Sequence, residues 1–97
     1  MELVDLEINE KIATITLKNG KVNAISHQVI AEINDALDQA QAASAAVILT
    51  GQPGVFSAGF DLKTMKESSD SAVALVTAGS TLSRRMLSFP FPVIGAC

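Results

Sequence analysis

The sequence has one cysteine, one histidine, and neither tryptophan nor tyrosine among its 97 residues. A single thiol, Cys97, cannot form a disulfide within the chain, and we expect it to behave as a small apolar residue. The only histidine is His27, so the sequence contains no cluster of Cys and His at metal-binding spacing. These shortages exclude a disulfide framework and a zinc-finger type of metal centre.

An excess of basic residues and long apolar runs are also missing. The seven basic and ten acidic side chains give a formal net charge of −3, which argues against nucleic acid as a partner because phosphate binding needs clustered Lys and Arg. The longest apolar runs, at residues 45–49 and 91–94, are far shorter than the roughly 20 residues that span a bilayer. The acidic first residues do not resemble a secretory signal. We therefore expect a cytoplasmic protein that does not bind membranes.

Hydrophobic residues are plentiful for so short a chain, at 48%. A small chain buries only a modest share of its surface, so this content favours apolar surface that further chain or a partner subunit covers. This content is a first indication that residues 1–97 are a piece of a larger domain.

The first half of the sequence predicts two strands and a helix. Alternating apolar residues at 4–8 and 13–17 are typical of paired antiparallel strands. Ser26 is a candidate N-cap, and apolar residues at helical spacing, with Ile33 and Leu37 among them, predict a helix over 26–43.

The second half predicts an α/β arrangement. Residues 45–50 form an apolar run that indicates a strand buried on both faces, reached from the preceding strand by a right-handed parallel crossover. A loop rich in Gly and Pro follows at 51–54. Polar residues at 68–71 predict a loop and helix cap, before an apolar helix face that ends ahead of Pro90. Residues 91–96 then begin another buried strand.

The segment after the 45–50 strand suits a ligand with negative charge. A strand, a Gly-rich turn and a short helix leave backbone N–H groups free at the mouth of a sheet. Ala58 and Gly59 let a ligand approach the backbone because neither has a bulky side chain. Such donors stabilise an oxygen that gains negative charge. An ordinary tight loop that serves only packing fits the same pattern and stays an alternative.

Three motifs in order carry a family resemblance. VILTG at residues 47–51 and FSAGFDL at 56–62 resemble "vvLTG…FSAGxDL" of the crotonase (enoyl-CoA hydratase/isomerase) superfamily. ITL at 15–17 with NAIS at 23–26 resembles its "ItLnrP…NAls", and FPVIGA at 91–96 resembles its "kPviAav" strand. The resemblance covers nearly the whole chain.

The resemblance implies a fold and an assembly. Members of this superfamily are built from strand-strand-helix turns coiled into a superhelix, and they commonly form trimers or pairs of trimers. The resemblance therefore implies an α/β crotonase-like ββα superhelix, truncated to its first turns. Its second oxyanion loop, catalytic carboxylates and C-terminal trimerisation helices fall after Cys97. Lys18-Asn19-Gly20 replaces the usual "nrP" loop, and together with Phe60 this departure leaves the particular reaction open.

The resemblance also implies a substrate and its binding residues. The substrate is an acyl-CoA thioester, and no further cofactor is implied. The thioester carbonyl is polarised by two backbone N–H groups, the first of which corresponds to that of Phe60. The implied CoA-binding positions are Ser57 and Ala58 for the adenine, Asn23 and Ala24 for the pantetheine groove, and the rest of the motif at Gly59, Asp61 and Leu62.

Each charged residue near these motifs has two possible interpretations. Lys21 and Lys63 are candidates for the CoA phosphates, and flexible surface lysines are the alternative. Asp61 is a candidate acid-base group, although we expect it to cap a short helix that runs through Lys66. Arg84 and Arg85 predict a solvated helix face or a subunit contact.

Other function classes fit less well. A serine hydrolase is disfavoured because Val55 replaces the first Gly of G-x-S-x-G around Ser57 and because His27 is predicted to face solvent. We expect residues 1–97 alone to be nearly inactive, since losing one oxyanion donor costs about 10²–10³-fold in rate. A non-catalytic acyl-CoA-binding or oligomer-scaffold fragment remains an alternative, as does an adaptor whose edge strand binds a peptide.

Overall fold

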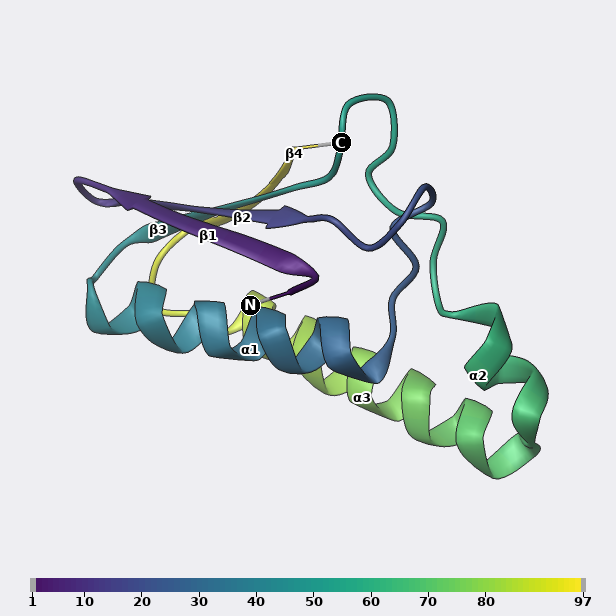
Figure 1. The fold of residues 1–97 in the computed structure, drawn as a ribbon. Helices are drawn as coiled ribbons and strands as arrows, with labels where there is room; N and C mark the ends of the chain where they lie inside the picture. Colours follow the sequence, from purple (N-terminus) through teal and green to yellow (C-terminus); the bar gives the residue numbers. More distant parts are fainter. Residues whose placement is uncertain (1, 97) are drawn as a thin grey trace.

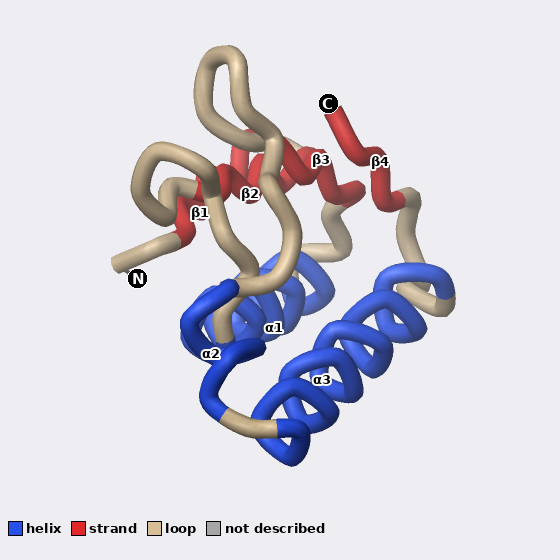
Figure 2. The backbone as a smooth tube through the Cα atoms, turned by 90° about the vertical axis from the view of Figure 1, so that its right-hand side faces the viewer, coloured by secondary structure: helices blue, strands red, loops and turns tan. Residues whose placement is uncertain are grey.

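The computed structural model describes residues 2–96, which form one four-stranded sheet with helices packed against it. The strands lie in the order β1-β2-β3-β4. Helices α1 and α3 lie side by side beneath one face of the sheet, and the connection from β3 to α2 rises above the sheet before it descends to the helices (Figures 1 and 2). Cys97 lies outside the described residues, as does the prediction made for it.

The first two strands form an antiparallel hairpin. Strands β1 (Val4–Asn9) and β2 (Ile12–Leu17) pair from Val4 with Leu17 to Asn9 with Ile12. Alternate residues point to opposite faces of a strand, so Ala13, Ile15 and Leu17 are all buried toward the helices. The predicted antiparallel pair is confirmed.

Helix α1 (His27–Ala42) begins where the sequence predicted. The Ser26 side chain accepts a hydrogen bond from the Val29 N–H over 3.2 Å, which satisfies one of the donors that a helix start leaves free. The buried face of the helix includes Ile33 and Leu37. This face supplies the centre of the core under the sheet.

Strands β3 (Ala46–Thr50) and β4 (Val93–Ala96) continue the sheet in parallel. The predicted parallel crossover from β2 to β3 is confirmed. The prediction that β3 is buried on both faces is wrong for the described residues, because only Val47 of this strand is buried and its other residues are partly exposed. The prediction of a buried strand is also wrong for β4, where Ile94 is 58% exposed. The reason is that the described helices cover one face of the sheet (Figure 2).

Helices α2 (Leu62–Glu67) and α3 (Ser69–Leu87) lie between β3 and β4 in the sequence. Ser68 caps α3 by accepting from the Ser71 N–H over 3.0 Å, as the polar run predicted. Arg85 donates to the Asn34 carbonyl oxygen over 3.0 Å and to Asp38 over 2.6 Å. The interpretation of Arg85 as part of a solvated face is therefore wrong, because its side chain ties α3 to α1, whereas a subunit contact stays a prediction.

Within residues 2–96, none of the helices combines the length and apolar character needed to cross a membrane. The same residues bring together no group of three His, Cys, Asp or Glu side chains that would hold a metal ion.

Candidate functional site

Two loops that are far apart in the sequence run side by side and form the framework of the site. The Ala58 N–H donates to the Val22 carbonyl over 2.8 Å, and the Ile25 N–H donates to the Gly59 carbonyl over 2.7 Å. A third bond of 2.8 Å runs from the Asp61 N–H to the Ile25 carbonyl. These bonds form a short parallel ladder, as in a sheet, and fix the segment after β3 against the segment before α1.

The ladder gives the amide of Phe60 a direction. The peptide between Gly59 and Phe60 is trans, since the described residues contain no cis peptide bond, and in a trans peptide the C=O and N–H point in opposite directions. Because the Gly59 carbonyl points at Ile25, the Phe60 N–H points away from it. Among the described residues this N–H has no hydrogen-bond acceptor. It is an oriented donor without a partner in the described part of the chain.

The same reasoning leaves a backbone acceptor beside that donor. The Ala58 N–H points at Val22, so the Ser57 carbonyl in the same trans peptide points away from Val22. No donor within the described part of the chain reaches this carbonyl. Ala58 and Gly59 are both exposed, and Gly59 adopts φ +97°, a conformation that favours glycine. The loop therefore offers a free carbonyl and a free amide with little side-chain obstruction.

Asn23 is the buried centre from which this loop is held. It is 0% exposed and adopts φ +51°, which Asn tolerates better than most residues. Its amide nitrogen donates to the Leu17 carbonyl over 3.0 Å and to the Phe56 carbonyl over 3.1 Å. Its amide oxygen accepts from the Asn19 N–H over 2.6 Å and from the Gln52 side chain over 2.9 Å. The side chain is thus occupied in joining the end of β2 to the loop after β3.

Ala24 follows Asn23 and is half-buried. Its carbonyl accepts from the Asn19 side chain over 2.8 Å, so its backbone oxygen also holds the loop together. The prediction that Asn23 and Ala24 line a pantetheine groove is untested and stays a prediction. For Asn23 it concerns the main chain, because the side chain is enclosed.

Asp61 caps α2, as the sequence predicted. Its carboxylate accepts from the Thr64 hydroxyl over 2.8 Å and from the Thr64 N–H over 3.1 Å. These two bonds, the hydroxyl first, lower the pKa of Asp61, with a smaller contribution from Lys63. A carboxylate that is stabilised in its charged form is a poor proton donor at neutral pH. The geometry favours the capping role over the acid-base role.

The remaining predicted binding residues are exposed. Leu62, the first residue of α2, is 67% exposed. Lys21 and Lys63 are also exposed, and neither forms an ion pair with another described residue. Each lies next to one of the two paired loops in the sequence. His27 is exposed at the start of α1, as predicted, and takes no part in the network around Ser57.

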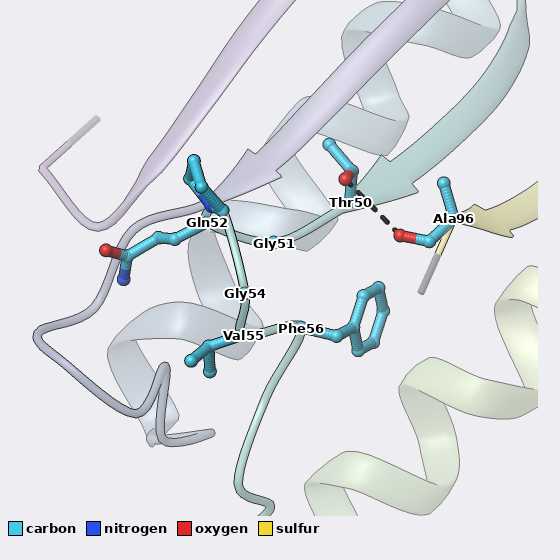
Figure 3. Close-up of a pocket in the computed structure, with 8 residues that line it drawn as sticks. Thr50, Gly51, Gln52, Gly54, Val55, Phe56 and Ala96 are labelled. Carbon is cyan, nitrogen blue, oxygen red and sulfur yellow. Dashed lines mark hydrogen bonds between the residues drawn. The ribbon is translucent and has the colours of Figure 1, made fainter.

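A cavity of about 510 Å³ lies at the carboxyl ends of β3 and β4. Figure 3 shows the side chains of Gln52, Val55 and Phe56 around the turn that lines it, with Thr50 donating to the Ala96 carbonyl over 3.3 Å. A Cβ atom on Gly51 would lie 2.5 Å from the Phe56 Cα and closer still to the Val55 carbonyl oxygen. The turn closes only because residue 51 is glycine. Sequence reasoning predicted a loop here but not the cavity.

A second, apolar cavity of about 240 Å³ lies under Phe60, between the sheet, α1 and α3. Its lining includes Phe56, Leu82 and Met86. The Phe60 ring packs directly against Gly79 of α3, where an added Cβ would lie 2.7–2.8 Å from two ring atoms. Sequence reasoning predicted an apolar face on this helix but missed this contact, for which the only signal was a glycine inside a helix.

Comparison with known proteins identifies the family and the fold. The enoyl-CoA hydratase/isomerase family model matches residues 7–97. A probable enoyl-CoA hydratase from Bacillus subtilis is 34% identical over 99% of this chain and 39% of its own length. The crystal structure of an enoyl-CoA hydratase/isomerase family protein from Pseudomonas syringae superposes with a TM-score of 0.97 at 57% identity, over 99% of this chain and 42% of that one.

An apo structure of an enoyl-CoA isomerase from Mycobacterium tuberculosis gives a TM-score of 0.92 at 36% identity, over 99% of this chain and 42% of that one. The fold of the described residues is therefore the first part of the crotonase fold, as the motifs predicted. The chain spans about two-fifths of the length of these relatives. With the family model matching residues 7–97, the chain belongs to the enoyl-CoA hydratase/isomerase family.

Proposed function

We propose that the protein binds acyl-CoA thioesters and that the Phe60 N–H donates a hydrogen bond to the thioester carbonyl oxygen. The observation that carries this proposal is the direction of the amide: its own peptide carbonyl is bonded to Ile25 on one side, which leaves the N–H pointing away from Ile25 without an acceptor among the described residues. A main-chain donor fixed before the ligand arrives costs no reorganisation during the reaction.

The chemistry suggested by the relatives' names needs such a donor. The Bacillus subtilis relative is described as a probable enoyl-CoA hydratase, and the Mycobacterium tuberculosis relative as an enoyl-CoA isomerase. Adding a nucleophile to an enoyl thioester, or moving its double bond, places negative charge on the thioester oxygen. One fixed donor at that oxygen is worth about 2.7–4 kcal/mol in the transition state.

The CoA moiety would bind along the same exposed loop. The free Ser57 carbonyl is a suitable acceptor for the adenine amino group, because a neutral carbonyl recognises a donor without a charge. Ala58 and Gly59 permit close approach. Lys21 and Lys63 remain the candidates for the phosphates, and the main chain at 23–24 and the exposed Leu62 for the pantetheine arm.

The proposal concerns a polypeptide of the relatives' full length, since the chain spans about two-fifths of them. A second oxyanion donor and the acid-base groups would come from outside the described residues. A cytoplasmic homotrimer or hexamer is part of the same proposal. No further cofactor is required.

The test compares two glycines in the natural protein. Gly59 and Gly54 have φ values of +97° and +82°, and a Cβ on either meets no atom within 4 Å, so Gly→Ala imposes a similar backbone strain at both. We expect Gly59→Ala to lower the rate of crotonyl-CoA hydration because it displaces the Phe60 amide. We also expect it to lower the affinity for CoA, because it adds a side chain where CoA approaches the loop. We expect Gly54→Ala to change neither.

Loss of the conjugated thioester absorbance measures the reaction, and titration calorimetry with CoA measures binding. An equal effect of the two substitutions would contradict a role for the Phe60 loop. CoA binding without turnover in the natural protein would favour the non-catalytic alternative.

A further inference from the structure

The hydroxyl of Ser57 joins the two paired loops. It donates to the main-chain carbonyl of Asn23 over 2.7 Å and accepts from the Gly59 N–H over 3.0 Å. A serine hydroxyl has one proton and two acceptor lone pairs, so the two bonds form together without competing. The hydroxyl is therefore a bridge from the loop before α1 to the segment that carries the Phe60 amide.

The anchor of this bridge is rigid. Asn23 is fully buried, and its side chain is bonded to the Leu17 carbonyl at the end of β2 and to the Phe56 carbonyl. Buried polar groups that are fully hydrogen-bonded hold a single arrangement. The carbonyl that receives the Ser57 proton is consequently fixed to the sheet.

The other end of the bridge restrains the main chain of Gly59. Gly59 has no Cβ to restrict it, and two hydrogen bonds hold it instead: Ser57 binds its N–H, and the Ile25 N–H binds its carbonyl. The orientation of the next peptide, which contains the Phe60 N–H, follows from both. Without the Ser57 bond, the Gly59 peptide keeps one of its two restraints.

We propose that Ser57 is a positioning residue whose hydroxyl keeps the Phe60 N–H directed at the thioester oxygen. This inference rests on the proposed function. The hydroxyl itself is engaged by main-chain groups, so it acts through the Phe60 amide. Its loss weakens a transition-state interaction, and a displacement of about 1 Å costs about 10²-fold in rate. The rate constant falls, and substrate binding changes little.

The first test is steady-state hydration of crotonyl-CoA by the natural protein. We expect Ser57→Ala to lower kcat about 10- to 100-fold with KM close to wild type, and Ser57→Thr, which keeps the hydroxyl, to recover most of kcat. Thr81→Ala is the matched control: its hydroxyl is exposed and bonded within α3 to the Thr77 carbonyl over 3.0 Å. We expect that variant to behave as wild type.

The second test reads the hydrogen bond directly. A donor on the carbonyl of a conjugated thioester polarises it and shifts its absorbance to longer wavelength. With hexadienoyl-CoA bound at saturation, we expect a smaller red shift in Ser57→Ala than in wild type, at a similar Kd. Wild-type protein that shows neither turnover nor a red shift would refute the proposed function itself.

Two results would overturn the positioning role while leaving the proposed function intact. One is an active wild type whose Ser57→Ala variant keeps both kcat and the red shift. The other is a Ser57→Ala variant with a higher Kd and a lower melting temperature whose bound substrate still shows the full red shift. That result would mean that Ser57 only stabilises the fold.

Discussion

Replacing Asn23 by aspartate exchanges one buried polar group for another of the same shape and replaces the donor of two of its hydrogen bonds with an acceptor. The side chain is 0% exposed. Its oxygen accepts from the Asn19 N–H and the Gln52 side chain, and a carboxyl oxygen keeps both bonds. Its nitrogen donates to the Leu17 and Phe56 carbonyls. A carboxylate oxygen in that place can donate to neither and repels both.

The magnitude depends on the protonation of the introduced carboxyl. In the protonated form one O–H restores one of the two donations, so the free energy of unfolding falls by about 1–2 kcal/mol. In the ionised form both donations are lost and a buried charge has no cation beside it, which costs about 3–5 kcal/mol. Burial next to two carbonyl oxygens therefore raises the pKa of the introduced carboxyl in the folded protein.

The sign of the pH dependence follows from that direction. A pKa that is higher in the folded than in the unfolded protein means that the folded form holds the proton more tightly above about pH 4, the value for an exposed Asp. The stability of Asn23→Asp relative to wild type should therefore decline as pH rises, by up to about 1.4 kcal/mol per pH unit. The decline ends once the folded-state carboxyl has ionised.

Urea unfolding of the natural protein, followed by circular dichroism between about pH 4 and pH 8, measures this difference. Asn9→Asp is the matched control because Asn9 is exposed at the end of β1, and its stability difference from wild type should stay nearly constant over the same range. An Asn23→Asp difference that is independent of pH would refute the enclosed, doubly donating arrangement of this side chain.

Two further substitutions test the framework around the site. Gly51→Ala should lower the melting temperature more than Gly20→Ala. A Cβ at residue 51 collides with main-chain atoms at a cost of about 1–3 kcal/mol or more, while one at residue 20 meets no atom within 4 Å and costs about 1 kcal/mol in backbone strain. Equal losses of melting temperature would contradict the close approach at Gly51. Glu32→Gln should reduce the loss of stability at acid pH. Partial burial raises the pKa of Glu32, but hydrogen bonds from the Leu3 N–H and the Gln28 side chain outweigh it and lower the pKa overall, so the wild type loses stability as pH falls below about 4. Melting temperatures that fall equally with pH in both proteins would contradict this.

The regular elements were predictable from the sequence because each has a local signal. Alternation marked β1 and β2, and a serine at each N-terminus marked the starts of α1 and α3. Burial was predicted less well. The apolar run of β3 suggested cover on both faces and that of β4 a buried strand, and periodicity within a strand cannot tell which face other elements cover.

The site was predictable only in part, because its decisive contacts join residues that are distant in the sequence. The small residues Ala58 and Gly59 indicated an exposed backbone, and the motif resemblance singled out Phe60. The pairing of Val22 with Ala58 had no signal, since neither loop has strand periodicity. The Ser57 hydroxyl was missed for the same reason: its acceptor, the Asn23 carbonyl, is 34 residues away.

Residue 60 combines two roles that its main chain and its side chain carry separately. The amide is oriented by bonds on its neighbours, Gly59 and Asp61, so the identity of the side chain at residue 60 does not set the direction of the N–H. The ring is then free to serve packing, and it fills the space that Gly79 leaves open on α3, above an apolar cavity of about 240 Å³. A smaller side chain at residue 60 would enlarge that cavity while leaving the donor in place. The loop that positions the amide and the helix that receives the ring can therefore vary independently, and one main-chain geometry is compatible with differently shaped surroundings.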